Sequence, residues 1–135
     1  MVECELARMI IRDNMDQQFI FLQEKNGLRK FPIIIGMYEA MEIARKIAEE
    51  TTARPLTHDL LRSILGALGV RLKRIVVDEL RSNTFHAKLH LEVGDKLHTV
   101  DSRPSDAIAL AVATGAPIFV EEAVLEAVCR EDVSD

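Results

Sequence analysis

The chain has 135 residues, of which 48% are hydrophobic, and its 22 acidic and 17 basic side chains give a formal net charge of −5. This length and apolar content fit one folded domain and exclude a disordered chain. The acidic balance excludes a broad basic clamp on nucleic acid, and two cysteines are too few for a disulfide scaffold.

The first half of the chain predicts three strands followed by two helices. Apolar spacing and turn residues place the strands at 2–11, 18–24 and 29–35 and the helices at 37–50 and 57–68. Pro32 cannot donate a ladder hydrogen bond, so the third strand should lie at a sheet edge or carry a bulge. Thr57 is the expected N-cap of the second helix, whose apolar side chains should form a buried stripe. Those side chains are Leu60, Leu61, Ile64, Leu65 and Leu68.

The second half predicts the same order of elements. Its strands are expected at 70–80, 84–93 and 96–100, a short extended piece at 117–120, and its helices at 104–114 and 121–130. Ser82-Asn83 should form the turn between the first two strands. Pro104 fits the first turn of a helix, and Gly115 is the expected C-terminal stop of that helix.

The two halves also match residue by residue. Leu6 aligns with Leu72 at an offset of 66, and Glu39 aligns with Asp106 at an offset of 67. We therefore expect an internally duplicated unit of three strands and two helices, with pseudo-repeats at 1–69 and 70–130. The alternative is a chance match between two strand-rich halves. The expected fold class is α+β, a single compact domain of mostly antiparallel sheets with helices packed against them.

Targeting signals and apolar runs bear on the cellular location of the chain. Segment 1–5 lacks the charged and apolar regions of a signal peptide, and no apolar run approaches the roughly 20 residues of a membrane span. We expect a cytoplasmic protein with no membrane partner, in which Cys4 and Cys129 are reduced core thiols. The domain should cover residues 1–130, and 131–135 should form an acidic tail.

Glu39 and Asp106 occupy the first turns of equivalent helices, and a pseudo-two-fold axis would bring them towards each other. Paired carboxylates can hold Mg²⁺ or Mn²⁺, which activates water and neutralises phosphoryl charge. Alternatively, both acids only stabilise helix starts through the helix dipole, and Arg103 pairs with Asp106.

A second group of candidate residues lies at the start of the helix predicted at 57–68. His58 is a candidate general base, with Asp59 as its orienter or as a metal ligand. Adjacent helical residues do not face each other, however, so a direct dyad is disfavoured. Capping alone would explain Thr57 and Asp59.

Residues 101–106 combine a strand end, a polar loop and a helix start. Free N–H groups there favour an anion, and Arg103 could hold a phosphate with two hydrogen bonds. In the alternative, Asp101 or Ser102 caps the helix and Arg103 bridges to a carboxylate. His86, Lys88 and His90 share one face of a predicted strand and are candidates for phosphate contact, unless they only form its solvated side.

Three ordered motifs resemble the bifunctional nuclease domain over about residues 2–130. They are Phe31-Pro32-Ile33-Ile34-Ile35-Gly36 with Glu39-Ala40, then Arg54-Pro55-Leu56-Thr57-His58-Asp59-Leu60, then residues 101–111. The resemblance implies hydrolysis of DNA and RNA by a compact α/β domain that oligomerises. The positions that it carries over are Glu39, Arg54, Thr57, His58, Asp59, Arg103, Ser105 and Asp106.

We therefore expect a nuclease of low sequence specificity, assisted by Mg²⁺ or Mn²⁺, that hydrolyses phosphodiester bonds in DNA and RNA. The candidate catalytic residues are His58, Asp59, Arg103 and Asp106. The candidate phosphate-binding residues are Arg54, Arg103, Ser105, His86, Lys88 and His90. The candidate metal ligands are Glu39, Asp59 and Asp106. The alternative is a non-catalytic oligomeric binding or regulatory protein, and in both cases the exposed strand edges predict a homo-oligomer.

Overall fold

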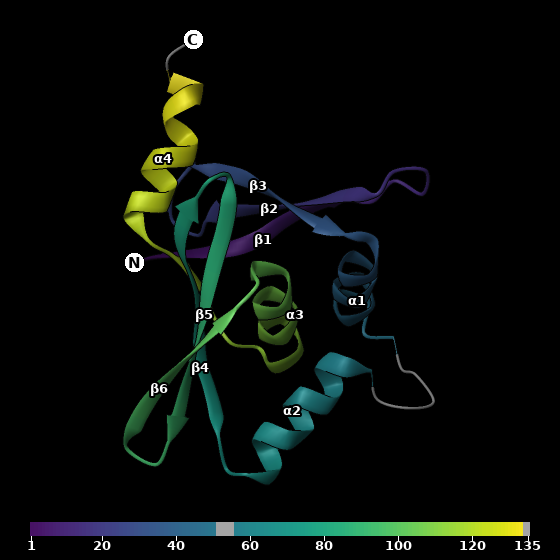
Figure 1. Ribbon diagram of the computed structural model, residues 1–135, viewed down its shortest axis with the longest axis vertical. Coiled ribbons are helices and arrows are strands. Elements are labelled where there is room, and N and C mark those ends of the chain that lie inside the picture. Colours follow the sequence, from purple (N-terminus) through teal and green to yellow (C-terminus); the bar gives the residue numbers. More distant parts are fainter. Residues whose placement is uncertain (51–55, 134–135) are drawn as a thin grey trace.

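One seven-stranded sheet organises the domain, with strand order β3-β2-β1-β7-β4-β5-β6 (Figure 1). The computed structural model describes residues 1–50 and 56–133, and the side chains of residues 1–50 and 56–129. The strands are β1 (Val2–Ile10), β2 (Gln17–Glu24), β3 (Lys30–Gly36), β4 (Arg71–Arg81), β5 (Thr84–Val93), β6 (Lys96–Ser102) and β7 (Ile118–Val120). The helices are α1 (Met37–Ile47), α2 (Thr57–Ala67), α3 (Pro104–Thr114) and α4 (Glu122–Val133).

Two antiparallel meanders, β1-β2-β3 and β4-β5-β6, are joined through β7. This short strand is antiparallel to β1, with Val120 opposite Val2, and parallel to β4, with Ile118 opposite Ile75. The predicted α+β class and the single compact domain are confirmed. The predicted extended piece at 117–120 is the strand that connects the two meanders. The internal duplication stays a prediction, because a shared element order does not establish a common origin.

Local backbone geometry confirms most predicted turns and stops. Ser82 and Asn83 have positive φ angles of 52° and 62°, which is the geometry of a two-residue hairpin turn. Gly115, with φ of 79°, ends α3. Helix α1 ends three residues earlier than predicted, and Glu49 beyond its end adopts φ of 55°. Pro32 lies in β3, which is an edge strand as predicted.

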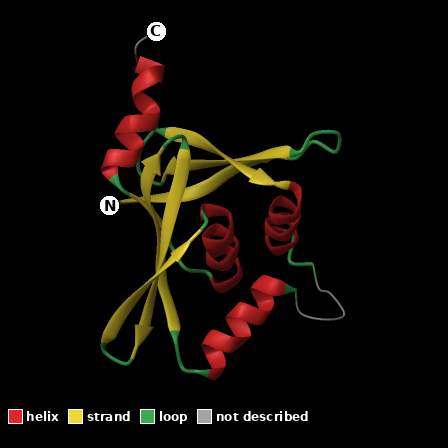
Figure 2. Cartoon of the chain, viewed as in Figure 1, coloured by secondary structure: helices red, strands yellow, loops and turns green. Residues whose placement is uncertain are grey.

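Helix α3 is the central helix of the domain. Figure 2 shows α1, α2 and α3 together in the angle between the two meanders. Residues 107–111 of α3 are all buried, because this helix is apolar on every side and packs against both neighbouring helices and the sheet. The first turn of α3 is therefore held in a fixed position relative to α1 and α2.

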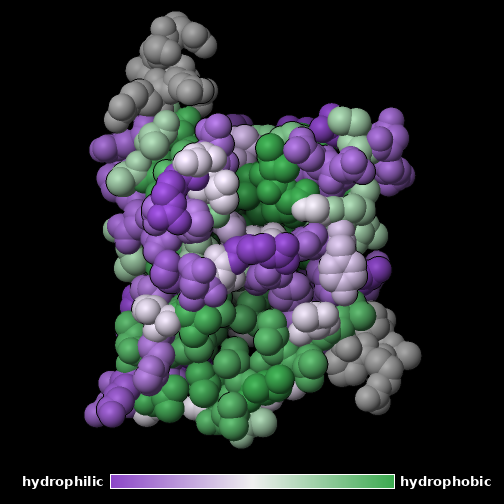
Figure 3. All heavy atoms as spheres, in the orientation of Figure 1, coloured by the Kyte–Doolittle hydropathy of each residue, from purple (hydrophilic) through white to green (hydrophobic). Residues whose placement is uncertain are grey.

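The prediction of a buried apolar stripe on α2 is wrong for most of its residues. Leu65 packs against the core, but Leu60, Leu61, Ile64 and Leu68 are 41–70% exposed. Helical spacing identifies an apolar face but does not show whether the same chain covers it. Figure 3 shows a broad hydrophobic area at the lower end of the molecule, where Figure 1 places α2.

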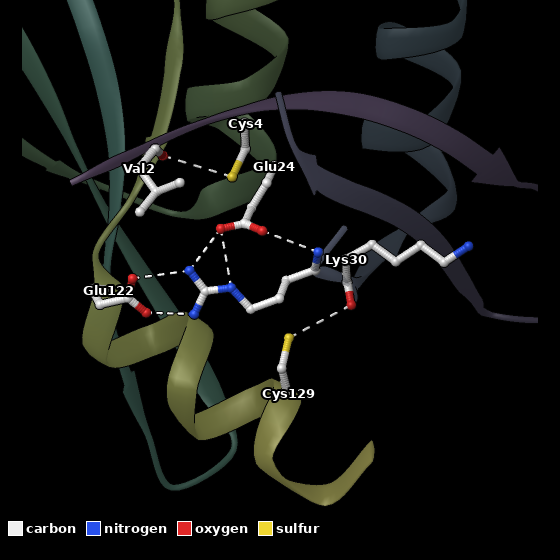
Figure 4. Close-up of polar contacts among 7 residues, drawn as sticks. Val2, Cys4, Glu24, Lys30, Glu122 and Cys129 are labelled. Carbon is white, nitrogen blue, oxygen red and sulfur yellow. Dashed lines mark hydrogen bonds and ion pairs between the residues drawn. The ribbon is translucent and has the colours of Figure 1, made fainter. Parts of the chain in front are cut away.

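Helix α4 is attached to the sheet by an arginine between two carboxylates, shown in Figure 4. Arg29 donates to Glu122 at 2.5 and 2.9 Å and to Glu24 at 2.6 and 3.0 Å. We call these three residues the Arg29 clamp. The hydrogen bonds from Arg29 lower the pKa of both glutamates. Cys4 and Cys129 are buried, as predicted.

Within the described residues, no helix has both the length and the apolar character needed to span a membrane. The cytoplasmic location stays a prediction.

Candidate functional site

Five ionisable side chains meet where the first turns of α2 and α3 face one side of α1. Helix α1 contributes two acids, α2 contributes a histidine, and the start of α3 contributes an arginine and an aspartate. We call this group the His58 cluster. Its members are Glu39, Glu42, His58, Arg103 and Asp106.

His58 lies between two carboxylates in the interior and is only 3% exposed. Its Nε2 atom is 3.1 Å from Oδ1 of Asp106, and its Nδ1 atom is 3.8 Å from Oε2 of Glu42. Each ring nitrogen of His58 therefore faces a carboxylate oxygen, one from α1 and one from α3. The side chain is thus placed to hold or pass a proton.

Glu42 is the functional candidate that the sequence analysis missed. It is fully buried, and among the described residues neither of its carboxylate oxygens has a hydrogen-bond partner. A buried carboxylate without hydrogen bonds is costly, so its presence beside His58 points to a role other than stability. The available signal was its spacing, because Glu42 follows Glu39 by three residues and shares its helix face.

Arg103 lies between the two first-turn acids. Its Nε atom donates to Oδ2 of Asp106 at 2.8 Å, and its Nη1 atom donates to Oε1 of Glu39 at 3.3 Å. Burial alone would raise the pKa of Asp106, but the hydrogen bonds from Arg103 and His58 outweigh it and lower that pKa. The Arg103 side chain is 64% exposed, so the guanidinium stays accessible from solvent.

The three predicted metal ligands do not converge. Glu39 and Asp106 share a cation, but that cation is the Arg103 guanidinium. Asp59 pairs instead with Lys46 and accepts a hydrogen bond from the backbone N–H of Leu56 at 3.1 Å. Within the described parts of the chain, no group of three or more His, Cys, Asp or Glu side chains is arranged to hold a metal ion. The residues as placed therefore do not fit a metal site, and metal assistance stays a prediction.

The start of α2 explains why His58 and Asp59 separate. The predicted N-cap, Thr57, is wrong: Leu56 is the N-cap, and the helix begins at Thr57, one residue earlier than a Thr57 cap would require. Asp59 caps the helix through its carboxylate, while His58 turns inward towards α3. The expectation that the two adjacent residues form no direct dyad is confirmed.

A cavity of about 420 Å³ opens beside the His58 cluster. Its walls come from β2, from β3 and from the turn between β4 and β5, and the start of α3 closes one side. Arg103 lines the cavity and also belongs to the cluster, so it connects the two. Ser105, a predicted phosphate ligand, is buried and lines the same cavity.

The predicted phosphate stripe on β5 lies on the other face of the sheet. Phe85, Ala87 and Leu89 face the core, so His86, Lys88 and His90 point away from the helices. Lys88 is paired with Asp78 and Asp101 at 3.3 and 3.2 Å. Burial, with Arg74 nearby, lowers the pKa of His90. The stripe is therefore separate from the His58 cluster.

Arg54, another predicted phosphate ligand, lies outside the described residues.

One family model and several known proteins are similar to this chain. A family model of the bifunctional nuclease domain matches residues 20–132. An uncharacterized protein of Mycobacterium tuberculosis is 41% identical over 125 residues, which cover 93% of this chain and 74% of that protein.

Two plant proteins share part of their length with the chain. Bifunctional nuclease 2 of Oryza sativa subsp. japonica is 27% identical over 84% of this chain and 36% of its own length. Bifunctional nuclease 2 of Arabidopsis thaliana is 29% identical over 75% of this chain and 31% of its own length. Since the family model covers most of the sequence, the chain belongs to the bifunctional nuclease domain family.

Proposed function

We propose that the chain hydrolyses phosphodiester bonds of DNA and RNA at the His58 cluster, with low sequence specificity. One observation carries the proposal: an accessible arginine lies between two carboxylates, with a buried histidine behind one of them and a cavity in front. A guanidinium group can bind a phosphate through two parallel hydrogen bonds. A fixed positive charge there stabilises the negative charge of the phosphoryl transition state. Family membership supports the same reaction class.

Arg103 is the proposed phosphate ligand. Its hydrogen bond to Glu39 is long at 3.3 Å, and its Nη2 atom donates to no described residue, so phosphate oxygens compete for the guanidinium at small cost. Contacts to phosphate carry no sequence information, which accounts for the low specificity.

Asp106 is the proposed base. Arg103 and His58 both lower its pKa, so it is a weak base while Arg103 is attached. When Arg103 turns to a phosphate, part of this effect is lost and Asp106 becomes a better proton acceptor. Water then attacks phosphorus, its proton moves to Asp106, the bond to the leaving oxygen breaks, and that oxygen takes a proton from solvent.

His58 and Glu42 are proposed positioning residues. Nε2 of His58 holds Asp106 in place, and Glu42 faces the other ring nitrogen and helps to fix the orientation of the ring. Mg²⁺ or Mn²⁺ remains a proposed cofactor, and it would need Arg103 to leave Glu39 and Asp106 before it could bind there.

The test is cleavage of end-labelled single-stranded RNA and DNA by the purified chain with Mg²⁺, Mn²⁺ or EDTA. We expect cleavage by the unmodified chain and a loss of at least about 100-fold in Arg103→Met and Asp106→Asn. Arg29→Met is the matched control, because Arg29 also pairs with two acids but lies away from the cluster. Cleavage unaffected by Asp106→Asn would contradict the mechanism, and cleavage lost in EDTA would assign a metal.

The second candidate function is a non-catalytic oligomeric binding protein. The observation that favours it is the exposed apolar face of α2, since contiguous apolar surface marks interaction sites. We also propose that the chain forms a homo-oligomer, with or without catalysis. Light scattering at micromolar concentration tests this, and a monomer mass would contradict it.

A further inference from the structure

The cavity beside Arg103 has a composition that the phosphate site alone does not explain. Its side walls are apolar and include Phe19, Ile34 and Phe85. Asn83 and Thr84 add uncharged polar side chains at one end, and Arg103 supplies the only charge among the described residues that line it. In Figure 3 a hollow in the upper half of the molecule has a hydrophobic floor and a hydrophilic lower rim.

The open edge of β3 faces this space. Among the described strands, β3 pairs only with β2, so the backbone groups on its outer edge are not used in the sheet. Residues 32–36 of β3 line the cavity. The cavity therefore combines apolar faces with a row of backbone donors and acceptors, interrupted at Pro32, which has no N–H.

A nucleobase has the matching chemistry. It is a flat ring with apolar faces and with hydrogen-bonding groups confined to its edge. Aromatic and aliphatic side chains bind the faces by stacking, independently of base identity. A volume of about 420 Å³ lies in the range of small-molecule sites and is far too small for a duplex.

We propose that this cavity binds the base of the nucleotide whose phosphate contacts Arg103. The inference rests on the proposed function, in which Arg103 binds the phosphate. The base site itself can be tested by measuring ligand affinity, without any cleavage reaction. Ile34 forms part of the wall and is 55% exposed on an edge strand, so a polar substitution there changes the cavity with little effect on the core.

The experiment compares the affinities of adenosine 5′-monophosphate and ribose 5-phosphate by titration calorimetry. We expect the nucleotide to bind at least about 10-fold more tightly, because stacking on the base adds to the phosphate contact. Ile34→Asn should weaken nucleotide binding by about 10-fold and leave ribose 5-phosphate unchanged. Ile47→Asn is the matched control, since Ile47 is 53% exposed on α1 and lies outside this cavity.

Three outcomes would overturn the base site. The first is equal affinities for the two ligands, and the second is nucleotide binding that Ile34→Asn does not change. The third is a capped apolar pentapeptide that binds the cavity when the nucleotide does not, which would indicate strand addition at β3. Nucleotide binding as expected in a chain without cleavage would remove the proposed function but keep the site. Cleavage of nucleic acid together with equal affinities for the nucleotide and ribose 5-phosphate would keep the proposed function but remove the base site.

Discussion

Two arginines in this domain each lie between two carboxylates, and they differ in how fully they are used. In the Arg29 clamp all three guanidinium nitrogens donate, and the side chain is 34% exposed (Figure 4). In the His58 cluster Arg103 donates to the described residues through Nε and Nη1 only, and its side chain is 64% exposed. A guanidinium whose three nitrogens all donate to carboxylates is typical of a structural link. A guanidinium with unused donors beside a cavity is typical of a ligand site.

The surroundings of the two arginines differ as well. Arg29 joins β2 to α4, two elements far apart in sequence, through Glu24 and Glu122. Arg103 has a buried histidine and a buried glutamate behind its aspartate. An arginine between two acids therefore indicates a ligand site only where a cavity lies in front of it and buried ionisable groups lie behind it.

The largest expected effect is a difference in cleavage activity between the variants of the two arginines. Arg103→Met should lower cleavage per folded molecule by at least about 100-fold, while Arg29→Met should leave it within about twofold. Cleavage of labelled RNA, normalised to the folded fraction from circular dichroism, measures both. Equal losses would show that the two arginines do not differ in function.

Cys4 offers a chemical probe beside the Arg29 clamp. Burial, with Glu24 nearby, raises the pKa of the Cys4 thiol from 9.0 to about 11. Only the thiolate reacts, so alkylation near pH 8 should be about 100-fold slower than that of a free thiol with the ordinary pKa. Iodoacetamide labelling in a Cys129→Ala background measures the rate. A rate equal to that of free cysteine would show that the region opens readily.

Substitution of Glu42 should raise stability and lower activity, whereas substitution in the Arg29 clamp should not lower activity. Glu42→Met removes a buried carboxylate that has no hydrogen bond to the described residues, so the free energy of unfolding should rise by about 1 kcal/mol. Activity should fall by about 10-fold, because His58 loses one of the two carboxylates that orient its ring. Urea unfolding and cleavage assays measure the two effects. A large loss of stability would reveal a partner that compensates the carboxylate.

The smallest expected effect is the pH dependence of the Arg29 clamp. Arg29 lowers the pKa of Glu24 and Glu122 in the folded state, so its contribution is present above the ordinary glutamate pKa and is lost as the pH falls through the lowered values. Arg29→Met should lower the melting temperature by a few degrees at pH 7. The difference should shrink steadily below pH of about 4.5. A difference that stays constant down to pH 2 would contradict this.

The sequence predicted the elements and much of the cluster. Apolar spacing and turn residues located every strand and helix to within a few residues, because those signals are local. Glu39, His58, Arg103 and Asp106 were all singled out, and the fold brings them together. Periodicity alone could not show that Asp59 turns away to Lys46, because side-chain partners depend on tertiary packing.

The remaining errors come from what a single sequence leaves open. Glu42 was passed over because a glutamate in a helix normally faces solvent. The apolar face of α2 was expected to be buried, although spacing does not reveal the covering surface. The partner of Glu122 is Arg29, 93 residues away, and no local pattern connects them. Acids near the C-terminus therefore include a structural residue as well as excess charge.

The three residues of β7 also determine when this domain can fold during synthesis. The inner edges of both meanders pair with residues 118–120, which leave the ribosome after all six other strands of the sheet. Until then, β1 and β4 each lack a neighbour on one side, and such edges favour pairing with other chains. Because the strand that covers both inner edges is the last of the seven in the sequence, these edges stay open to pairing with other chains until it is made.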